Sequence, residues 1–135
     1  MRSWLVDKSA LVRLPFAVRR DEWQSRLERG LLRITNITRL EVGFSAISAG
    51  MAREASSIPP ISLMPVEYLT PAIEARALEV QLMLAERGIH RAASVPDLLV
   101  AATAEKLRLT VLAVDKGFAL IAEVTGQRVE TLAYQ

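Results

Sequence analysis

The sequence has no cysteine, a single histidine and no long apolar run, and these features argue against disulfide-bonded and membrane-spanning proteins. Without cysteine no disulfide holds the fold together, and a reducing cytoplasm is the default compartment. No apolar stretch approaches the roughly 20 residues that a membrane-spanning helix needs. The opening apolar run, residues 4–6, stops at Asp7 and lacks the long apolar centre of a signal peptide. We therefore expect a cytoplasmic protein with no membrane partner.

The 135 residues are 51% hydrophobic and carry a formal net charge of only +2. This length favours one domain, residues 1–135, and the composition allows a generous core. It also leaves apolar surface to spare, which favours an oligomer or a bound partner. Arginine outnumbers lysine by 14 to 3. Arginine suits phosphate and carboxylate recognition, although a GC-rich genome explains the same bias.

Aspartate is scarce, and its placement is informative. There are 4 aspartates against 11 glutamates, and Asp7, Asp97 and Asp115 adjoin strongly apolar segments. Charges that only keep a protein in solution do not usually lie there. These three residues are therefore candidates for a functional site.

The apolar pattern alternates between strands and helices. Strands are expected at residues 4–6, 31–35, 110–114 and 128–134, with a short extended piece within the proline-rich loop 56–70. Helices are expected at residues 9–14, 21–29, 38–49, 71–87, 98–107 and 118–124. Such an alternation predicts an α/β fold whose parallel sheet is covered by helices on both faces.

In such sheets functional groups gather beyond the carboxyl ends of the strands. Asp7 and Asp115 both follow predicted buried strands, so we expect them at this edge. Each also has a structural explanation, since aspartate is common at helix caps and turns. Glu41 and Asp97 follow Thr38 and Ser94 at the spacing of a capping box, which explains them equally well one at a time.

Taken together, four carboxylates at one sheet edge would repel one another, and a hard cation relieves that repulsion. With no cysteine and one histidine in the chain, an oxygen-rich site favours Mg²⁺, or Mn²⁺ as a substitute, over zinc. Such ions support phosphodiester cleavage, in which Ser9 and Thr38 would hold carboxylates or waters in place.

Four short segments make this pattern specific: residues 6–11 (VDKSAL), 37–41 (ITRLE), 96–104 (PDLLVAATA) and 114–118 (VDKGF). Their order and spacing resemble the motifs of PIN-domain ribonucleases, and in particular the VapC toxins of type II toxin–antitoxin modules. Segments 88–92 (GIHRA) and 121–127 (IAEVTGQ) also resemble one VapC branch. The resemblance covers nearly the whole chain.

The resemblance implies a three-layer α/β/α fold with a mostly parallel sheet. It implies a magnesium-dependent endoribonuclease, usually a homodimer, that is blocked by a VapB-like antitoxin. Carried over by position, Asp7, Glu41, Asp97 and Asp115 would be the catalytic, metal-binding acids, and Ser9 would support the first of them.

Three departures bear on the number of metal ions. Lys8 replaces a common threonine, Ala113 a common threonine or histidine, and Gly117 an acid that many members carry. The missing acid leaves one-metal and two-metal chemistry open. It also favours the main alternative, a catalytically weak or inactive module that keeps the fold and binds an antitoxin or RNA. A phospho-acceptor domain is a further alternative, and Lys8 after Asp7 argues against it.

Basic residues near the motifs are candidate RNA contacts: Lys8, Arg13 and Arg91. The alternative is that they are solvated surface charges. Trp4 and Trp23 are expected in the core, so no aromatic platform for RNA bases is predicted.

Overall fold

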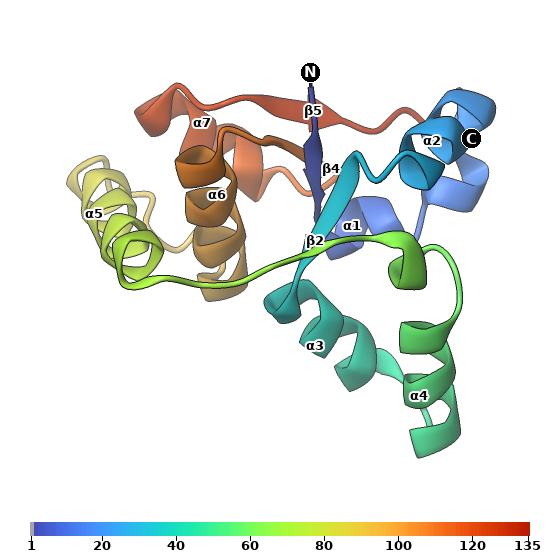
Figure 1. The fold of residues 1–135 in the computed structure, drawn as a ribbon. Coiled ribbons are helices and arrows are strands. Elements are labelled where there is room, and N and C mark those ends of the chain that lie inside the picture. The colour runs from blue at the N-terminus through green and yellow to red at the C-terminus, as the bar shows by residue number, and fades with distance from the viewer. Residues whose placement is uncertain (1) are drawn as a thin grey trace.

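The central sheet consists of five parallel strands within residues 2–135, which the computed structural model describes. The strand order is β3-β2-β1-β4-β5, so the first strand lies in the middle of the sheet (Figure 1). The strands are β1 (Trp4–Val6), β2 (Leu32–Thr35), β3 (Val66–Glu67), β4 (Thr110–Ala113) and β5 (Val129–Thr131). This confirms the predicted α/β class.

Helices lie on both faces of the sheet. Helices α5, α6 and α7 pack on one face and α1 and α2 on the other, while α3 and α4 extend from the edge at which β1 and β2 end (Figure 1). The α-helices are α1 (Lys8–Leu11), α2 (Arg20–Glu28), α3 (Asn36–Ser45), α4 (Ala49–Ser57), α5 (Pro71–Glu86), α6 (Val95–Leu107) and α7 (Gly117–Thr125), with 3₁₀ turns η1 (Leu14–Phe16) and η2 (Ile61–Leu63). Among residues 2–135, no helix has the length and apolar character needed to cross a membrane.

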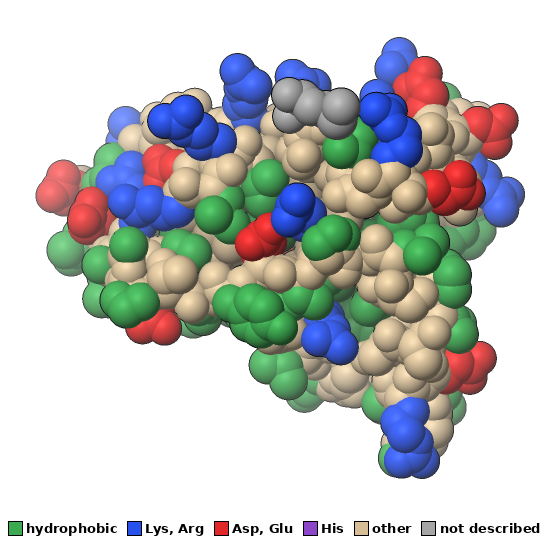
Figure 2. All heavy atoms as spheres, viewed as in Figure 1, with side chains coloured by type: hydrophobic (Ala, Val, Ile, Leu, Met, Phe, Trp, Pro, Cys, Tyr) green, Lys and Arg blue, Asp and Glu red, His purple; other side chains and the backbone are tan. Residues whose placement is uncertain are grey.

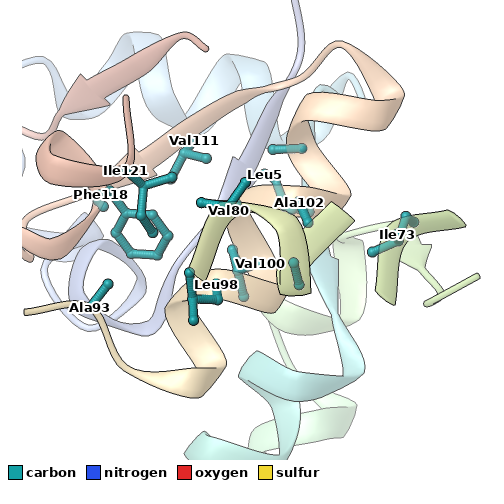
Figure 3. Close-up of a cluster of buried hydrophobic side chains, with 14 of the residues drawn as sticks. Leu5, Ile73, Val80, Ala93, Leu98, Val100, Ala102, Val111, Phe118 and Ile121 are labelled. Carbon is teal, nitrogen blue, oxygen red and sulfur yellow. The ribbon is translucent and has the colours of Figure 1, made fainter. Parts of the chain in front are cut away.

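Two apolar clusters flank the sheet because successive side chains of a strand point to opposite faces. Leu5 of β1 and Val111 of β4 belong to the cluster under α5, α6 and α7, together with Phe118 (Figure 3). Trp4 belongs to the opposite cluster, where its ring meets that of Trp23 edge to face with centroids 5.2 Å apart. The predicted core positions of both tryptophans are confirmed. Packing of both clusters against β1 and β4 holds these two strands side by side. It thereby fixes the positions of the residues that follow their carboxyl ends.

The predicted helix 38–49 is wrong, because the structure has two helices there. Thr35 caps α3 by accepting a hydrogen bond from the backbone N–H of Thr38 at 3.1 Å. Ser48 then caps α4 by accepting from the N–H of Met51 at 3.2 Å. Gly50 therefore lies in the first turn of α4 and does not end α3. Several hydroxyl residues in this segment could cap a helix, and the sequence alone did not rank them.

Other boundaries also move. The predicted helix 9–14 is the shorter α1, and Pro15 lies within η1 and does not end a helix. Asp21 lies in the first turn of α2, whose N-cap position is Arg19. The predicted last strand shrinks to β5, whose pairing with β4 is parallel. The extended piece predicted within the loop 56–70 is present as β3.

We expect Phe118→Ala to lower the free energy of unfolding by about 3–5 kcal/mol, because Phe118 is fully buried and its loss leaves a cavity. Chemical denaturation measures this change. The matched control is Phe44→Ala on α3, where the ring is 85% exposed and the expected change is within about 0.5 kcal/mol. Similar losses in both variants would contradict the described core.

Candidate metal centre

The parallel strands β1 and β4 bring Asp7 and Asp115 to the same edge of the sheet. The two strands are hydrogen-bonded neighbours, with Val6 opposite Leu112. Asp7 follows β1 directly, and its backbone N–H donates to the carbonyl of Leu112 at 2.9 Å. Asp115 lies two residues beyond the end of β4. Both acids therefore lie where the strand pattern places them.

Ser9 links the ends of these two strands. Its hydroxyl donates to Oδ2 of Asp7 at 2.7 Å, and its backbone N–H donates to the same oxygen at 3.0 Å. The Ser9 Oγ also accepts from the backbone N–H groups of Val114 and Asp115, at 2.9 and 3.1 Å. Asp7, only 5% exposed, thereby caps α1 and is held in one orientation at the sheet edge. Asp7 can therefore cap α1 and also belong to a functional site.

Asp97 lies in the first turn of α6, in a capping box with Ser94. The N–H of Asp97 donates to Oγ of Ser94 at 3.1 Å, and the N–H of Ser94 donates to Oδ2 of Asp97 at 3.4 Å. The structural explanation offered by the sequence is thus present. The carboxyl is nevertheless only 7% exposed and lies close to two other acids. A cap alone does not need that environment.

Gly117 provides the space that the Asp97 and Asp115 carboxyls occupy. A Cβ atom at position 117 would lie 2.7 Å from Oδ2 of Asp97 and 3.3 Å from Oδ1 of Asp115. Both oxygens therefore face the same Cα atom. The N–H of Gly117 also donates to Oδ1 of Asp115 at 2.8 Å. A side chain here would displace the Asp97 carboxyl from its present position.

Glu41 lies well inside α3, so the proposed capping box with Thr38 is wrong. Thr35 is the cap, which leaves Glu41 without a helix-capping role. Its Oε1 atom is buried and has no hydrogen-bond partner in the described part of the chain. Burial raises the pKa of Glu41, as do the charges of Asp7 and Asp115, while Lys8 lowers it. A buried carboxylate oxygen without a partner is costly, and this feature requires an explanation.

The acids interact as one group. Burial, followed by the charges of Asp115 and Asp7, raises the pKa of Asp97 to about 6, and hydrogen bonds from Ser94 oppose the rise. Glu41 interacts with two of the same neighbours, Asp7 and Asp115. The structure therefore brings all four predicted acids into one negatively charged region.

The donor set of this region fits a hard divalent cation. Its ligands would be carboxylate oxygens, which such ions prefer, and the chain has no cysteine to favour a softer metal. As the side chains stand, no group of three or more His, Asp or Glu residues within residues 2–135 is arranged so that it could hold a metal ion. Mg²⁺ is usually held by one or two carboxylates and several waters, so binding it does not require a group of three.

Comparison with known proteins adds an independent observation. The sequence model of the PIN domain matches residues 4–124. The chain belongs to the PIN-domain family. Ribonuclease VapC2 of Mycobacterium tuberculosis (strain CDC 1551 / Oshkosh) is 60% identical over 132 residues, covering 98% of this chain and 94% of that protein. Ribonuclease VapC21 of strain ATCC 25618 / H37Rv is 39% identical over 129 residues, covering 94% and 91%.

Solved structures share the fold of this PIN domain. DNA-bound VapBC from Salmonella typhimurium superposes with a TM-score of 0.76 at 16% identity, covering 97% of this chain and 98% of that chain. VapBC2 from Rickettsia felis, bound to a promoter DNA fragment, gives 0.77 at 12% identity, covering 95% and 97%. At these identities the likeness shows the fold alone.

Lys8 and Thr38, two further residues singled out in the sequence, have different surroundings in this PIN domain. The Lys8 Nζ donates to Oγ of Ser45 on α3, and its charge acts on Glu41 at the rim of the acidic region. Thr38 is fully buried and accepts a 3.4 Å hydrogen bond from Oγ1 of Thr35. Among the described residues it bonds no carboxylate, so it supports α3 and not an acid directly.

Arg13 and Arg91 lie outside the group of acids. The Nη1 of Arg13 donates to the Ser9 carbonyl at 2.8 Å, and its guanidinium stacks on Tyr134 with the ring centroid 5.2 Å away. These two contacts of Arg13 link α1 to Tyr134 near the C-terminal end of the chain and hold α1 in place. Arg91 is exposed in the segment between α5 and α6 that leads to the capping box.

The sequence reasoning missed an apolar hollow beside Glu41. It measures about 420 Å³, and Leu40 and Phe44 of α3 line it together with Lys8. Leu40 and Phe44 are both strongly exposed. The sequence does contain a sign of this hollow, because Leu40 and Phe44 are four residues apart and so lie on the same face of a helix. The predicted helix 38–49 had the wrong boundaries, so the exposure of this face was not recognised.

We expect Asp97→Asn to stabilise the metal-free protein at neutral pH. The folded state holds the Asp97 proton up to a pKa of about 6, against 3.8 ordinarily, so this group costs stability as the pH rises through that interval. The asparagine variant should be more stable by on the order of 2 kcal/mol at pH 7.5 in EDTA, with no gain near pH 4. Urea denaturation at both pH values measures the difference.

The control for this comparison is Asp21→Asn, which changes an exposed acid on α2 and should have little effect at either pH. A gain that is equal at both pH values, or a loss at pH 7.5, would contradict the electrostatic account of Asp97.

Proposed function

We propose that residues 1–135 form a single PIN domain that acts as a magnesium-dependent endoribonuclease, the toxin of a type II toxin–antitoxin pair. The observation that carries the proposal is the gathering of four interacting carboxyls at the carboxyl edge of a parallel sheet. One of them, Glu41, has a buried oxygen with no hydrogen-bond partner among residues 2–135. The VapC proteins similar to this chain are named ribonucleases, which supports RNA as the substrate.

In this proposal Asp7, Glu41, Asp97 and Asp115 are the catalytic acids and hold Mg²⁺, with Mn²⁺ as a substitute. The chemistry that Mg²⁺ would supply when bound there is polarisation of a phosphate oxygen and a lower pKa for an attacking water. The chain contributes orientation. Ser9 fixes the Asp7 carboxyl through two hydrogen bonds, and the N–H of Gly117 fixes that of Asp115. Held in this way, the carboxyls lose little freedom when an ion binds.

Two of the candidate RNA contacts fit this geometry better than the third. Lys8 lies at the rim of the acidic region, where its ammonium can meet a phosphate of the bound strand. Arg91 is exposed near the start of α6. Arg13 is already bonded to Ser9 and Tyr134, so we assign it to the support of α1.

The proposed protein partner is a VapB-like antitoxin in the cytoplasm. Fold neighbours include complexes described as VapBC toxin–antitoxin systems. The hollow beside Glu41 offers exposed Leu40 and Phe44 to an apolar side chain, and the adjacent carboxyls suit an antitoxin arginine. For the proposed homodimer, α5 presents Leu78 and Leu82, which are 65% and 66% exposed.

A second function, a module that binds its partner without catalysis, has one observation in its favour. Position 117 is glycine, and within residues 2–135 no group of three or more acids is arranged to hold a metal ion. Such a module would retain no RNA cleavage that depends on Asp7 or on Mg²⁺. The experiment below therefore separates the two functions.

We expect Asp7→Asn and Asp97→Asn each to lower the rate of RNA cleavage by at least about 100-fold, because each removes a charge that holds the ion. The assay follows single-turnover cleavage of total RNA with Mg²⁺, with Mn²⁺ and with EDTA. Cleavage should occur with either ion and be absent in EDTA.

Asp21→Asn serves as the matched control, since it removes an aspartate charge from exposed α2 and should cleave like the wild type. Equal rates for Asp7→Asn and the wild type would overturn the nuclease proposal. Absence of cleavage by the wild type would favour the binding module.

A further inference from the structure

The backbone at Arg108 is unusual for this chain. Among residues 2–135, four have a left-handed φ, and three of them are the glycines at positions 30, 88 and 126. The fourth is Arg108, with φ 57°, at the C-terminal cap of α6. Glycine adopts this conformation without steric cost, whereas a residue with a Cβ atom does not. Because glycine would fit this backbone better than arginine, a role for the Arg108 side chain is worth examining.

The Arg108 side chain lines a polar hollow of about 380 Å³ at the ends of α6 and α7 and the start of β5. The walls of this hollow are fixed by hydrogen bonds. The Gln127 amide donates to the Ala101 carbonyl at 2.9 Å, and the Thr125 hydroxyl donates to the Ile121 carbonyl at 3.0 Å. The hollow is thus a formed feature of the fold and is large enough for a group the size of one nucleotide.

The charge of this hollow is positive. Arg108 and Arg128 both line it, both are exposed, and neither forms an ion pair within residues 2–135. The acid of the lining, Glu105, is neutralised by two hydrogen bonds from Arg76, at 2.6 and 3.1 Å. Two guanidinium groups therefore remain available. Figure 2 shows further Lys and Arg side chains along the edge of the molecule where β5 lies and β1 begins (compare Figure 1).

The hollow lies at the opposite end of α6 from the group of acids. Asp97 is in the first turn of this helix and Arg108 is its C-terminal cap, eleven residues later. At 1.5 Å per residue they are about 16 Å apart along the helix axis. The hollow is therefore separate from the proposed metal centre and cannot contact the same phosphate.

We propose that this hollow binds a phosphate of the RNA backbone, in a part of the substrate away from the bond that is cut. The identity of the polyanion rests on the proposed nuclease function. Arginine presents a planar fork that matches phosphate oxygens, and two forks at one hollow bind a backbone phosphate without reading its base. Because the hollow lies at the far end of α6, a long RNA reaches both sites and a very short one does not.

The test measures RNA binding in EDTA by fluorescence anisotropy, for the double variant Arg108→Gly/Arg128→Gln. The probes are a labelled 30-nucleotide stem-loop RNA and a labelled four-nucleotide RNA, each at 50, 100 and 200 mM KCl. For the long RNA we expect the double variant to bind roughly tenfold more weakly than the wild type at 50 mM KCl. The slope of the logarithm of the binding constant against the logarithm of the KCl concentration should be shallower by about 1 to 2. The short RNA can occupy the hollow but cannot reach both sites at once, so we expect a smaller loss of affinity for it than for the long RNA.

The glycine variant also separates binding from stability. Arg108→Gly alone should leave the melting temperature unchanged or raise it, because it relieves the left-handed backbone. The matched control is Arg20→Gln/Arg53→Gln, which removes two exposed arginine charges elsewhere and should keep full affinity. Equal losses in the control pair would overturn the proposal in favour of a general charge effect.

Two further outcomes are decisive. If the double variant keeps its affinity for the long RNA, the hollow does not bind an RNA phosphate and the proposal is wrong. Cleavage of the same stem-loop by the wild type in Mg²⁺ is recorded in parallel. Absence of cleavage counts against the nuclease function alone, since the binding measurement in EDTA stands by itself.

Discussion

Mutual repulsion among four carboxyls is the constraint on which the rest of the structure depends. Asp7, Glu41, Asp97 and Asp115 come from four different segments, and the fold holds them close enough that their charges act on one another. Such an arrangement costs free energy without a cation. The parallel pairing of β1 and β4 offsets this cost because it fixes the backbone just before Asp7 and Asp115. The apolar clusters on both faces of the sheet hold that pairing in place.

Ser9 shows how the constraint is met locally. One hydroxyl donates to Asp7 and accepts from the N–H groups that follow β4, so the strand ends cannot spread apart under repulsion without losing these bonds. Gly117 leaves room for the Asp97 carboxyl, because a side chain at position 117 would displace it. The glycine that departs from the family pattern thus has a packing role in this chain.

The sequence predicted those parts of the structure that depend on local pattern. The apolar runs before Asp7 and Asp115 identified β1 and β4, and the parallel arrangement followed from their alternation with helices. The capping of α3 was not predictable, because Thr35, Thr38 and Ser48 compete as caps and tertiary packing decides among them. The left-handed cap at Arg108 was equally hidden, since a glycine would normally mark such a position. The catalytic role of the four acids stays a prediction.

The convergence of the four acids on one cation is tested by a crystal structure determined with Mn²⁺, whose anomalous scattering locates the ion. We expect a strong peak at the carboxyl edge of the sheet, with oxygens of Asp7 and Asp97 within about 2.5 Å of it. An ion bound elsewhere, or acids that stay apart with no peak between them at saturating Mn²⁺, would contradict this convergence.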